Sequence, residues 1–144
     1  MKIRQISILI DNKAGAIKDA LNVLKDANIQ IITSNIADTF NYGIYRIICS
    51  DPEKAHKVLL EAKFNVTIGE IYALKVENKV GEAANIISLL TSNGVNIAYL
   101  YSFMLRNEGI LIFNTYDSDR ANEVIQKNNI QILSEKELFE VCLK

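Results

Sequence analysis

Two short turns contain the residues of this sequence that are best suited to bind a small ligand. The first turn, Asp11-Asn12-Lys13-Ala14-Gly15, follows an alternating apolar run and precedes a helical pattern, and Glu77-Asn78-Lys79-Val80-Gly81 repeats it 66 residues later. A strand-to-helix turn leaves backbone N–H groups free at the helix start, where a carboxylate or another small anion can bind. Both turns, with the first helical residues Ala16 and Glu82, therefore form the candidate ligand-binding site.

Each side chain of the two turns has a functional and a structural interpretation. The acidic residue can meet the amine of a ligand, or it can simply interact favourably with the helix dipole. The asparagine can contact a ligand or tie the turn together, and the glycine can admit a ligand or allow helix and strand to pack closely. The lysine can contact an anion or remain solvated. The sequence leaves these alternatives open.

The other reactive side chains predict no catalytic centre, metal site or cofactor. His56 is the only histidine, is expected on the exposed side of a helix, and has no Cys or carboxylate at metal-ligand spacing. Cys49 and Cys142 are too isolated for a disulfide framework or a metal motif. Tyr99 and Tyr101 can line a pocket, although aromatic residues on a strand more often belong to a core or an interface.

The two turns belong to a longer internal repeat. A shift of 66 residues aligns the chain with itself without a gap, and apolar positions match in type as well as in identity. The identical pairs are Asn12/Asn78, Lys13/Lys79, Gly15/Gly81, Leu24/Leu90, Ile31/Ile97, Asn41/Asn107, Gly43/Gly109, Ile44/Ile110, Asp51/Asp117, Ala55/Ala121 and Val58/Val124. So long a register indicates duplication of one small unit.

Each copy predicts the element order β-α-β-β-α-β. In the first copy we expect strands over 6–10, 29–37, 44–49 and 64–68. One helix is expected directly after the turn. A second helix is expected to begin at residues 50–53, where Asp or Ser can cap the helix N-terminus and Pro52 suits the first helical turn. The buried helix positions are expected to be Ile17, Ala20, Leu21, Leu24 and Ala27, then Ala55, Val58, Leu59 and Ala62.

The ends of these elements also have sequence signals. Asn28 and its counterpart Gly94 are expected to stop the first helix of each copy. In the hairpin turns over 40–43 and 106–109 we expect the final glycine, Gly43 or Gly109, to adopt positive φ. The second copy runs over about 70–133, with Ala121, Val124 and Ile125 facing inward, and a tail helix follows over 135–141.

This order predicts an α+β fold: two ferredoxin-like βαββαβ units in tandem, each an antiparallel sheet with helices on one face. The expected domains are residues 1–68 and 69–144, and residues 64–77 read as strand running into strand with no linker between them. Residues 110–113 are apolar on both faces, so the outer face of that sheet is expected to be covered by the first unit, by another chain, or by both. We therefore expect at least a homodimer.

Composition limits the partners and the location. The 144 residues are 49% hydrophobic and 23% charged, and 16 basic residues nearly balance 17 acidic ones, so charge favours neither nucleic acid nor an anionic membrane. No apolar run approaches the roughly 20 residues of a membrane helix, and the N-terminal run is interrupted by Ser7 and followed by Asp11, unlike a signal peptide. We expect a cytoplasmic protein.

At this point the chain resembles a tandem ACT-domain protein, over about residues 3–133. The family turn Asn-x-Pro-Gly maps to residues 12–15 and 78–81, with Ala14 and Val80 in place of the proline. In that family the domain senses small molecules, most often amino acids. The ligand lies against this turn of one domain and near the second strand of its neighbour, which adds Asn96 and Ile97 to the site.

The resemblance implies a non-catalytic regulatory protein that binds an amino acid or similar small ligand at the turns and the domain interface, and acts on a separate metabolic enzyme. The alternative is a structural protein that docks to an enzyme without a ligand. Enzymes and carriers of the same plan fit less well, because the turns lack the Arg of an acylphosphatase and the Cys-x-x-Cys of a copper carrier. The sequence leaves open which ligand binds and whether one or both turns bind it.

Overall fold

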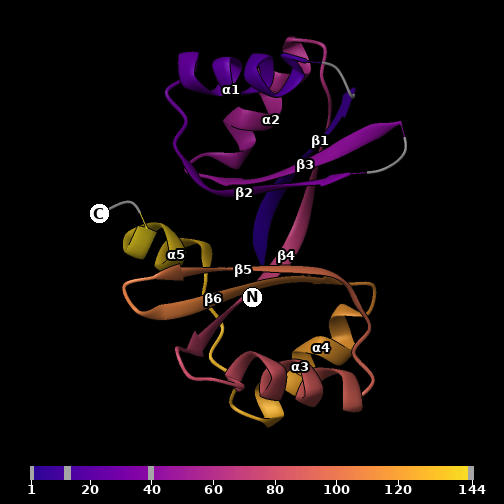
Figure 1. The fold of residues 1–144 in the computed structure, drawn as a ribbon, viewed down its shortest axis with the longest axis vertical. Helices are drawn as coiled ribbons and strands as arrows, with labels where there is room; N and C mark the ends of the chain where they lie inside the picture. The colour runs from indigo at the N-terminus through magenta and orange to yellow at the C-terminus, as the bar shows by residue number, and fades with distance from the viewer. Residues whose placement is uncertain (1, 12–13, 39–40, 143–144) are drawn as a thin grey trace. The chain divides into compact units, whose positions relative to one another are not determined.

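The computed structural model describes residues 2–11, 14–38 and 41–142 (Figure 1). Its strands are β1 (Ile3–Asp11), β2 (Ile31–Asp38), β3 (Tyr42–Cys49), β4 (Asn65–Glu77), β5 (Ile97–Leu105) and β6 (Glu108–Thr115). Its helices are α1 (Ala16–Asp26), α2 (Pro52–Glu61), α3 (Glu82–Ser92), α4 (Ser118–Lys127) and α5 (Glu135–Cys142).

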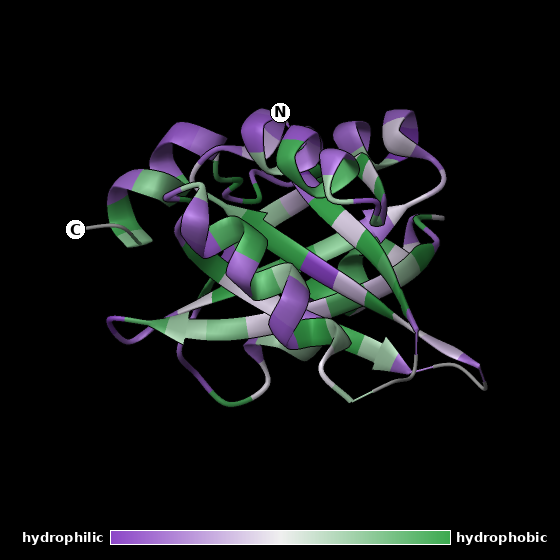
Figure 2. Cartoon of the chain, turned by 90° about the horizontal axis from the view of Figure 1, so that it is seen from above, coloured by the Kyte–Doolittle hydropathy of each residue, from purple (hydrophilic) through white to green (hydrophobic). Residues whose placement is uncertain are grey.

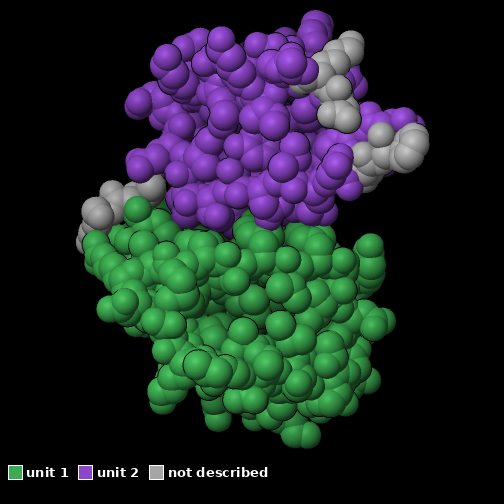
Figure 3. Space-filling model, viewed as in Figure 1, with its two compact units in different colours: residues 1–3, 70–142, 144 green, residues 4–69, 143 purple. Residues whose placement is uncertain are grey.

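The chain forms two compact units, which Figure 3 distinguishes by colour. Residues 4–69 form the N-terminal unit, and residues 70–142 with Lys2 and Ile3 form the C-terminal unit. Strand β4 contributes residues 65–69 to the first unit and residues 70–77 to the second. The chain thus passes from one unit to the next within a continuous strand, as the lack of a linker in the sequence predicts.

The two units have matching sheets. The strand order is β2-β3-β1-β4 in the N-terminal unit and β4-β6-β5 in the C-terminal unit. The strand pairs β1–β3 and β2–β3 of the first unit are antiparallel, and they correspond to β4–β6 and β5–β6 of the second unit. The aligned residues have the same register: Ile10 pairs with Gly43, and Val76 pairs with Gly109. The predicted tandem ferredoxin-like α+β fold is confirmed.

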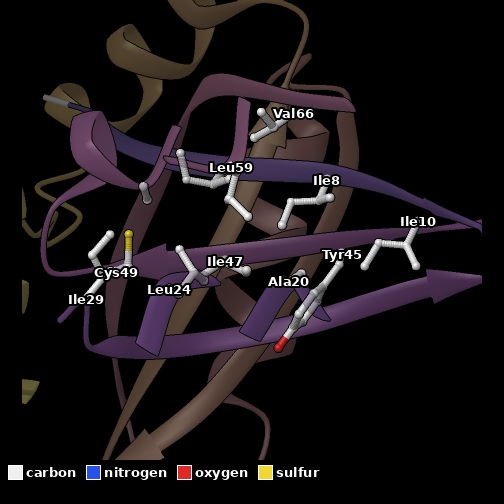
Figure 4. Packing of buried hydrophobic residues seen from close by; sticks show 12 residues of the cluster. Ile8, Ile10, Ala20, Leu24, Ile29, Tyr45, Ile47, Cys49, Leu59 and Val66 are labelled. Carbon is white, nitrogen blue, oxygen red and sulfur yellow. The ribbon is translucent and has the colours of Figure 1, made fainter. Parts of the chain in front are cut away.

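Helices cover one face of each sheet, and apolar residues pack between the two layers. The N-terminal core consists of Ile6, Ile8, Ile10, Ala20, Leu24, Ile29, Tyr45, Ile47, Cys49, Ala55, Leu59 and Val66 (Figure 4). The C-terminal core consists of Tyr72, Leu74, Val76, Leu90, Val95, Leu111, Phe113, Ala121, Val124 and Ile125. The helices carry hydrophilic residues beside the hydrophobic ones, as amphipathic helices do (Figure 2).

Repeated signals fix the helix ends. The side chains of Asp51 and Asp117 accept hydrogen bonds from the backbone N–H of Lys54 and Arg120 and so cap α2 and α4. After α1 and α3, Asn28 and Gly94 adopt φ values of 58° and 85°, which confirms them as helix stops.

Three details differ from the sequence expectations. Gly43 and Gly109 lie within strands without positive φ, because Arg106 and Asn107, at φ values of 49° and 67°, form the second hairpin turn by themselves. Phe40 of the first hairpin lies outside the described residues. Two helix positions predicted to be buried are exposed: Ala62, since α2 ends at Glu61, and Ile17, which is 39% exposed on the first turn of α1.

The third difference is the last strand of the C-terminal unit. It is reduced to a single bridge between Leu74 and Ile132, flanked by two backbone hydrogen bonds to β4. The chain leaves the sheet there because Ser134 and Glu137 form a reciprocal capping box at distances of 2.9 and 3.1 Å, which starts α5. The predicted tail helix is confirmed.

Four apolar residues of the C-terminal sheet alternate with the core residues of the helix side. Ile71 and Ala73 of β4 and Ile110 and Ile112 of β6 are at most 2% exposed. Coverage of this face by the first unit or by another chain stays a prediction, and so does a homodimer.

Neighbouring leucines of α2 provide a test of the N-terminal core. Leu59 is fully buried and Leu60 is 54% exposed. We expect Leu59→Ala to lower the free energy of unfolding by about 2–5 kcal/mol, because it removes core contacts and leaves a cavity. Leu60→Ala is the matched control and should change it by less than about 1 kcal/mol. Urea unfolding of both variants checks the prediction, and equal losses would contradict the assigned helix face.

Candidate ligand-binding site

Both strand-to-helix turns end in a glycine with left-handed geometry. Gly15 and Gly81 precede α1 and α3 with φ values of 90° and 86°, and their carbonyl groups accept the first helical hydrogen bonds, from Asp19 and Asn85 at 2.9 Å. No atom lies within 4 Å of a Cβ built on either glycine. Backbone conformation, and not close helix–strand packing, is therefore what requires glycine here.

In the C-terminal unit, the turn is held by its own charged residues. The N–H of Lys79 donates to the carbonyl of Glu77 at 2.9 Å, and Lys79 Nζ lies 2.9 Å from Glu77 Oε2. The hydrogen bond to Lys79 holds the pKa of the Glu77 carboxyl below its usual value, and the same bond raises the pKa of Lys79. Both side chains are thus charged at neutral pH and stand exposed at the end of β4.

A pocket of about 250 Å³ lies beneath this turn. Its lining comes from the end of β4, the first turn of α3 and the β5–β6 hairpin. The lining residues are Val76, Glu77, Asn78, Lys79, Ala83, Ser102, Phe103, Met104, Gly109, Ile110 and Leu111. The pocket is therefore mainly apolar, and the polar side chains of its lining are the ion pair of Glu77 with Lys79, the Asn78 amide and the Ser102 hydroxyl.

The structure brings only part of the predicted site together. Glu77, Asn78 and Lys79 line the pocket, whereas Val80 is fully exposed. Gly81 and Glu82 shape the backbone beside it, since the N–H of Glu82 donates to the carbonyl of Lys79 at 3.2 Å.

Asn96 and Ile97 lie at the other end of the C-terminal sheet. Ile97 pairs with Thr115 of β6, whereas Glu77 pairs with Glu108 at the opposite end of that strand. Seven strand residues separate these positions, roughly 23 Å. They do not reach the turn of their own unit, and their part in a site stays a prediction.

The sequence did not single out the pocket residues Ala83, Ser102 and Met104. Their only signal is register: Ser102 and Met104 lie on β5 opposite Leu111 and Gly109. A short side chain beside a glycine at one end of a sheet leaves a hollow. Such a hollow can be predicted only when the pairing of the strands is known.

The first turn is described only in part, because Asn12 and Lys13 lie outside the described residues. Asp11, Ala14 and Ala16 border a hollow of about 440 Å³ together with Asp19 and Lys63. This hollow extends along β1 and the start of β4, not over β2 and β3. It is therefore not the counterpart of the C-terminal pocket.

Within the described residues, no three His, Cys, Asp or Glu side chains gather to hold a metal ion. The described helices are also too short or too polar to cross a membrane. Cys49 is buried and Cys142 is partly buried, and both are free thiols.

The sequence model of the ACT domain pair matches residues 1–142. The chain belongs to this family. Among solved structures, the ACT pair is similar to protein BT0572 from Bacteroides thetaiotaomicron, with 31% identity over 97% of each chain and a TM-score of 0.91. No curated protein matches the sequence.

More distant structures share the fold. The regulatory subunit of aspartate kinase from Thermus thermophilus, in its ligand-free form, is 12% identical over 86% of this chain and 91% of its own, with a TM-score of 0.62. The subunit from Thermus flavus is 15% identical over 86% and 90%, with a TM-score of 0.60.

The glycine of the C-terminal turn provides a stability test. Gly81→Ala should lower the free energy of unfolding by about 1 kcal/mol, because a Cβ disfavours left-handed φ even where space is open. Gly69→Ala is the matched control, since Gly69 also has open space but lies in β4 without positive φ. It should leave stability unchanged or slightly higher. Thermal unfolding compares the two, and equal effects would contradict the turn geometry.

The ion pair of the turn provides a pH test. Lys79→Ala should raise the pKa of Glu77 toward the ordinary glutamate value, because the hydrogen bond that lowers it is removed. Lys127→Ala removes an exposed lysine of α4 and should leave the pKa of Glu77 unchanged. An NMR titration of the Glu77 side chain measures both, and an unchanged pKa in Lys79→Ala would show that the pair does not form in solution.

Proposed function

We propose that this ACT domain pair is a non-catalytic regulatory protein that binds an amino acid, or a similar small ligand, at the strand-to-helix turn. The observation that carries the proposal is the pocket beneath the C-terminal turn, which combines an apolar interior with one positive and one negative side chain at its edge. An amino acid has the complementary arrangement, with a carboxylate, an ammonium group and a side chain on one carbon.

The turn residues divide the binding of such a ligand between them. Lys79 and the uncapped N–H groups in the first turn of α3 attract the carboxylate, because a cation and a helix N-terminus both favour an anion. The Glu77 carboxylate, whose lowered pKa keeps it ionised at neutral pH, attracts the ammonium group. The amide of Asn78 has donors and an acceptor for either group.

The regulatory role rests on the family. ACT domains sense small molecules, and two solved structures with this fold are described as regulatory subunits of aspartate kinase. We therefore propose that this chain acts on a separate metabolic enzyme, and that it does so as a cytoplasmic homodimer. Sedimentation of the purified chain with and without an amino acid tests the oligomeric part.

A thermal-shift screen against the twenty amino acids and common keto acids tests ligand binding. A compound at 100 times its dissociation constant should stabilise the fold by about 2.7 kcal/mol, which raises the midpoint by roughly 5–11 °C. Lys79→Met should abolish the shift by removing the carboxylate partner. Lys127→Met, which removes an exposed lysine of α4, should retain it.

The outcome separates the two candidate functions. If no compound shifts the midpoint at millimolar concentration, ligand sensing is wrong and the chain is better described as a docking protein. A shift that survives Lys79→Met would place the ligand away from this turn.

A further inference from the structure

The two copies of the turn differ in the space beneath them. In the N-terminal unit Ile36 lies over Gly43, so that a Cβ atom on this glycine would lie 3.0 Å from Ile36 Cδ1 and 3.2 Å from Cγ1. Gly43 is buried as a result. Gly109 has the same register but is partly exposed; its Cβ position lies 3.1 Å from the backbone oxygen of Val76, and the nearest side-chain atoms are Val76 Cβ at 3.6 Å and Met104 Sδ at 3.8 Å.

The aligned residues explain this difference. Four positions that line the C-terminal pocket hold a smaller residue than their N-terminal counterparts: Val76 against Ile10, Ala83 against Ile17, Ser102 against Ile36, and Leu111 against Tyr45. Tyr45 is largely buried in the N-terminal core (Figure 4), and its hydroxyl donates to Ser34 Oγ at 3.0 Å.

Three lining residues differ in the opposite direction: Glu77, Phe103 and Met104 are larger than their counterparts Asp11, Ala37 and Asp38. The side chain of Met104 is 56% exposed, and its Sδ lies 3.8 Å from the Cβ position of Gly109.

We infer that the C-terminal unit alone provides the ligand site, with one ligand per chain, and that the ligand is an amino acid with a small apolar side chain. In the N-terminal unit Ile36 lies over Gly43, and the larger Ile17 stands at the position of Ala83. The inference rests on the proposed function, and it adds which copy binds and which ligand class fits.

The size and lining of the pocket support this class. Its volume of about 250 Å³ lies below the 300–1,000 Å³ typical of sites for larger ligands. Val76, Ala83, Met104 and Leu111 supply apolar lining. The two charged lining residues are matched by the carboxylate and ammonium groups of the amino acid itself. A charged ligand side chain would then lose its hydration without gaining a partner, which is unfavourable.

Isothermal titration calorimetry of the full chain tests the inference. The probes are L-valine, L-leucine, L-isoleucine and L-methionine, with L-lysine and L-glutamate as charged comparisons. We expect one site per chain for the apolar probes. Their affinity should exceed that of the charged probes by about tenfold or more, because a buried unpaired charge is disfavoured.

Two substitutions close the C-terminal pocket with residues taken from the N-terminal copy. Ser102→Ile and Ala83→Ile should each weaken the binding of the apolar probes by about tenfold or more, since the added atoms occupy the pocket. The fold accepts isoleucine at both aligned positions of the other unit, and an unchanged thermal midpoint without probe confirms that the variants are folded. Ile36→Ser is the reciprocal control and should leave affinity within about twofold.

The possible results separate this inference from the proposed function. Two molecules bound per chain, unchanged affinity in both closing variants, or loss of binding in Ile36→Ser would overturn the assignment to the C-terminal unit. Preference for L-lysine or L-glutamate would overturn the ligand class. In each of these cases an amino acid still binds and the proposed function stands, whereas absence of binding by all twenty amino acids overturns both.

Discussion

At each turn the chain changes from strand to helix within a few residues, and a glycine with left-handed φ makes this change possible. Any other residue at Gly15 or Gly81 would add about 1–2 kcal/mol of backbone strain. Within the described residues, no side chain caps α1 or α3 at these glycines. In α3 the N–H of Glu82 donates to the carbonyl of Lys79, and the N–H groups that follow it in the first turn have no side-chain cap and can bind an anion. The same backbone conformation sets each helix on its sheet and creates the polar edge of the candidate site.

Duplication preserved this backbone but not the side chains around it. Gly43 and Gly109 keep one register in both units, yet Ile36 covers the first and Ser102 leaves the second open. The fold tolerates this change of side-chain size because the core of each unit lies under the middle of its helices and strands. There Leu59 of the first unit and Ile125 of the second stay buried. Side chains at the end of a sheet can thus change size without loss of the fold, and one copy can gain a binding site that the other lacks.

The sequence predicted the elements well because their signals are local. The caps Asp51 and Asp117 and the stop at Gly94 depend on residues within one turn of the chain. The pocket depends instead on pairing between β5 and β6 and on the approach of α3, so Ser102 and Ala83 carried no local signal. The hairpin glycines were misassigned for a related reason.

In that hairpin, two consecutive residues with positive φ, Arg106 and Asn107, close the turn without glycine. Gly109 is thereby left for the strand, where its missing side chain makes room beneath the turn at Glu77. The lack of proline at Val80 has a comparable consequence. Proline would restrict φ there, and in its absence the turn is ordered by Gly81, by two backbone hydrogen bonds and by the exposed pair of Glu77 with Lys79. An exposed ion pair contributes little to stability, so both charges can exchange partners with a zwitterionic ligand at small free-energy cost.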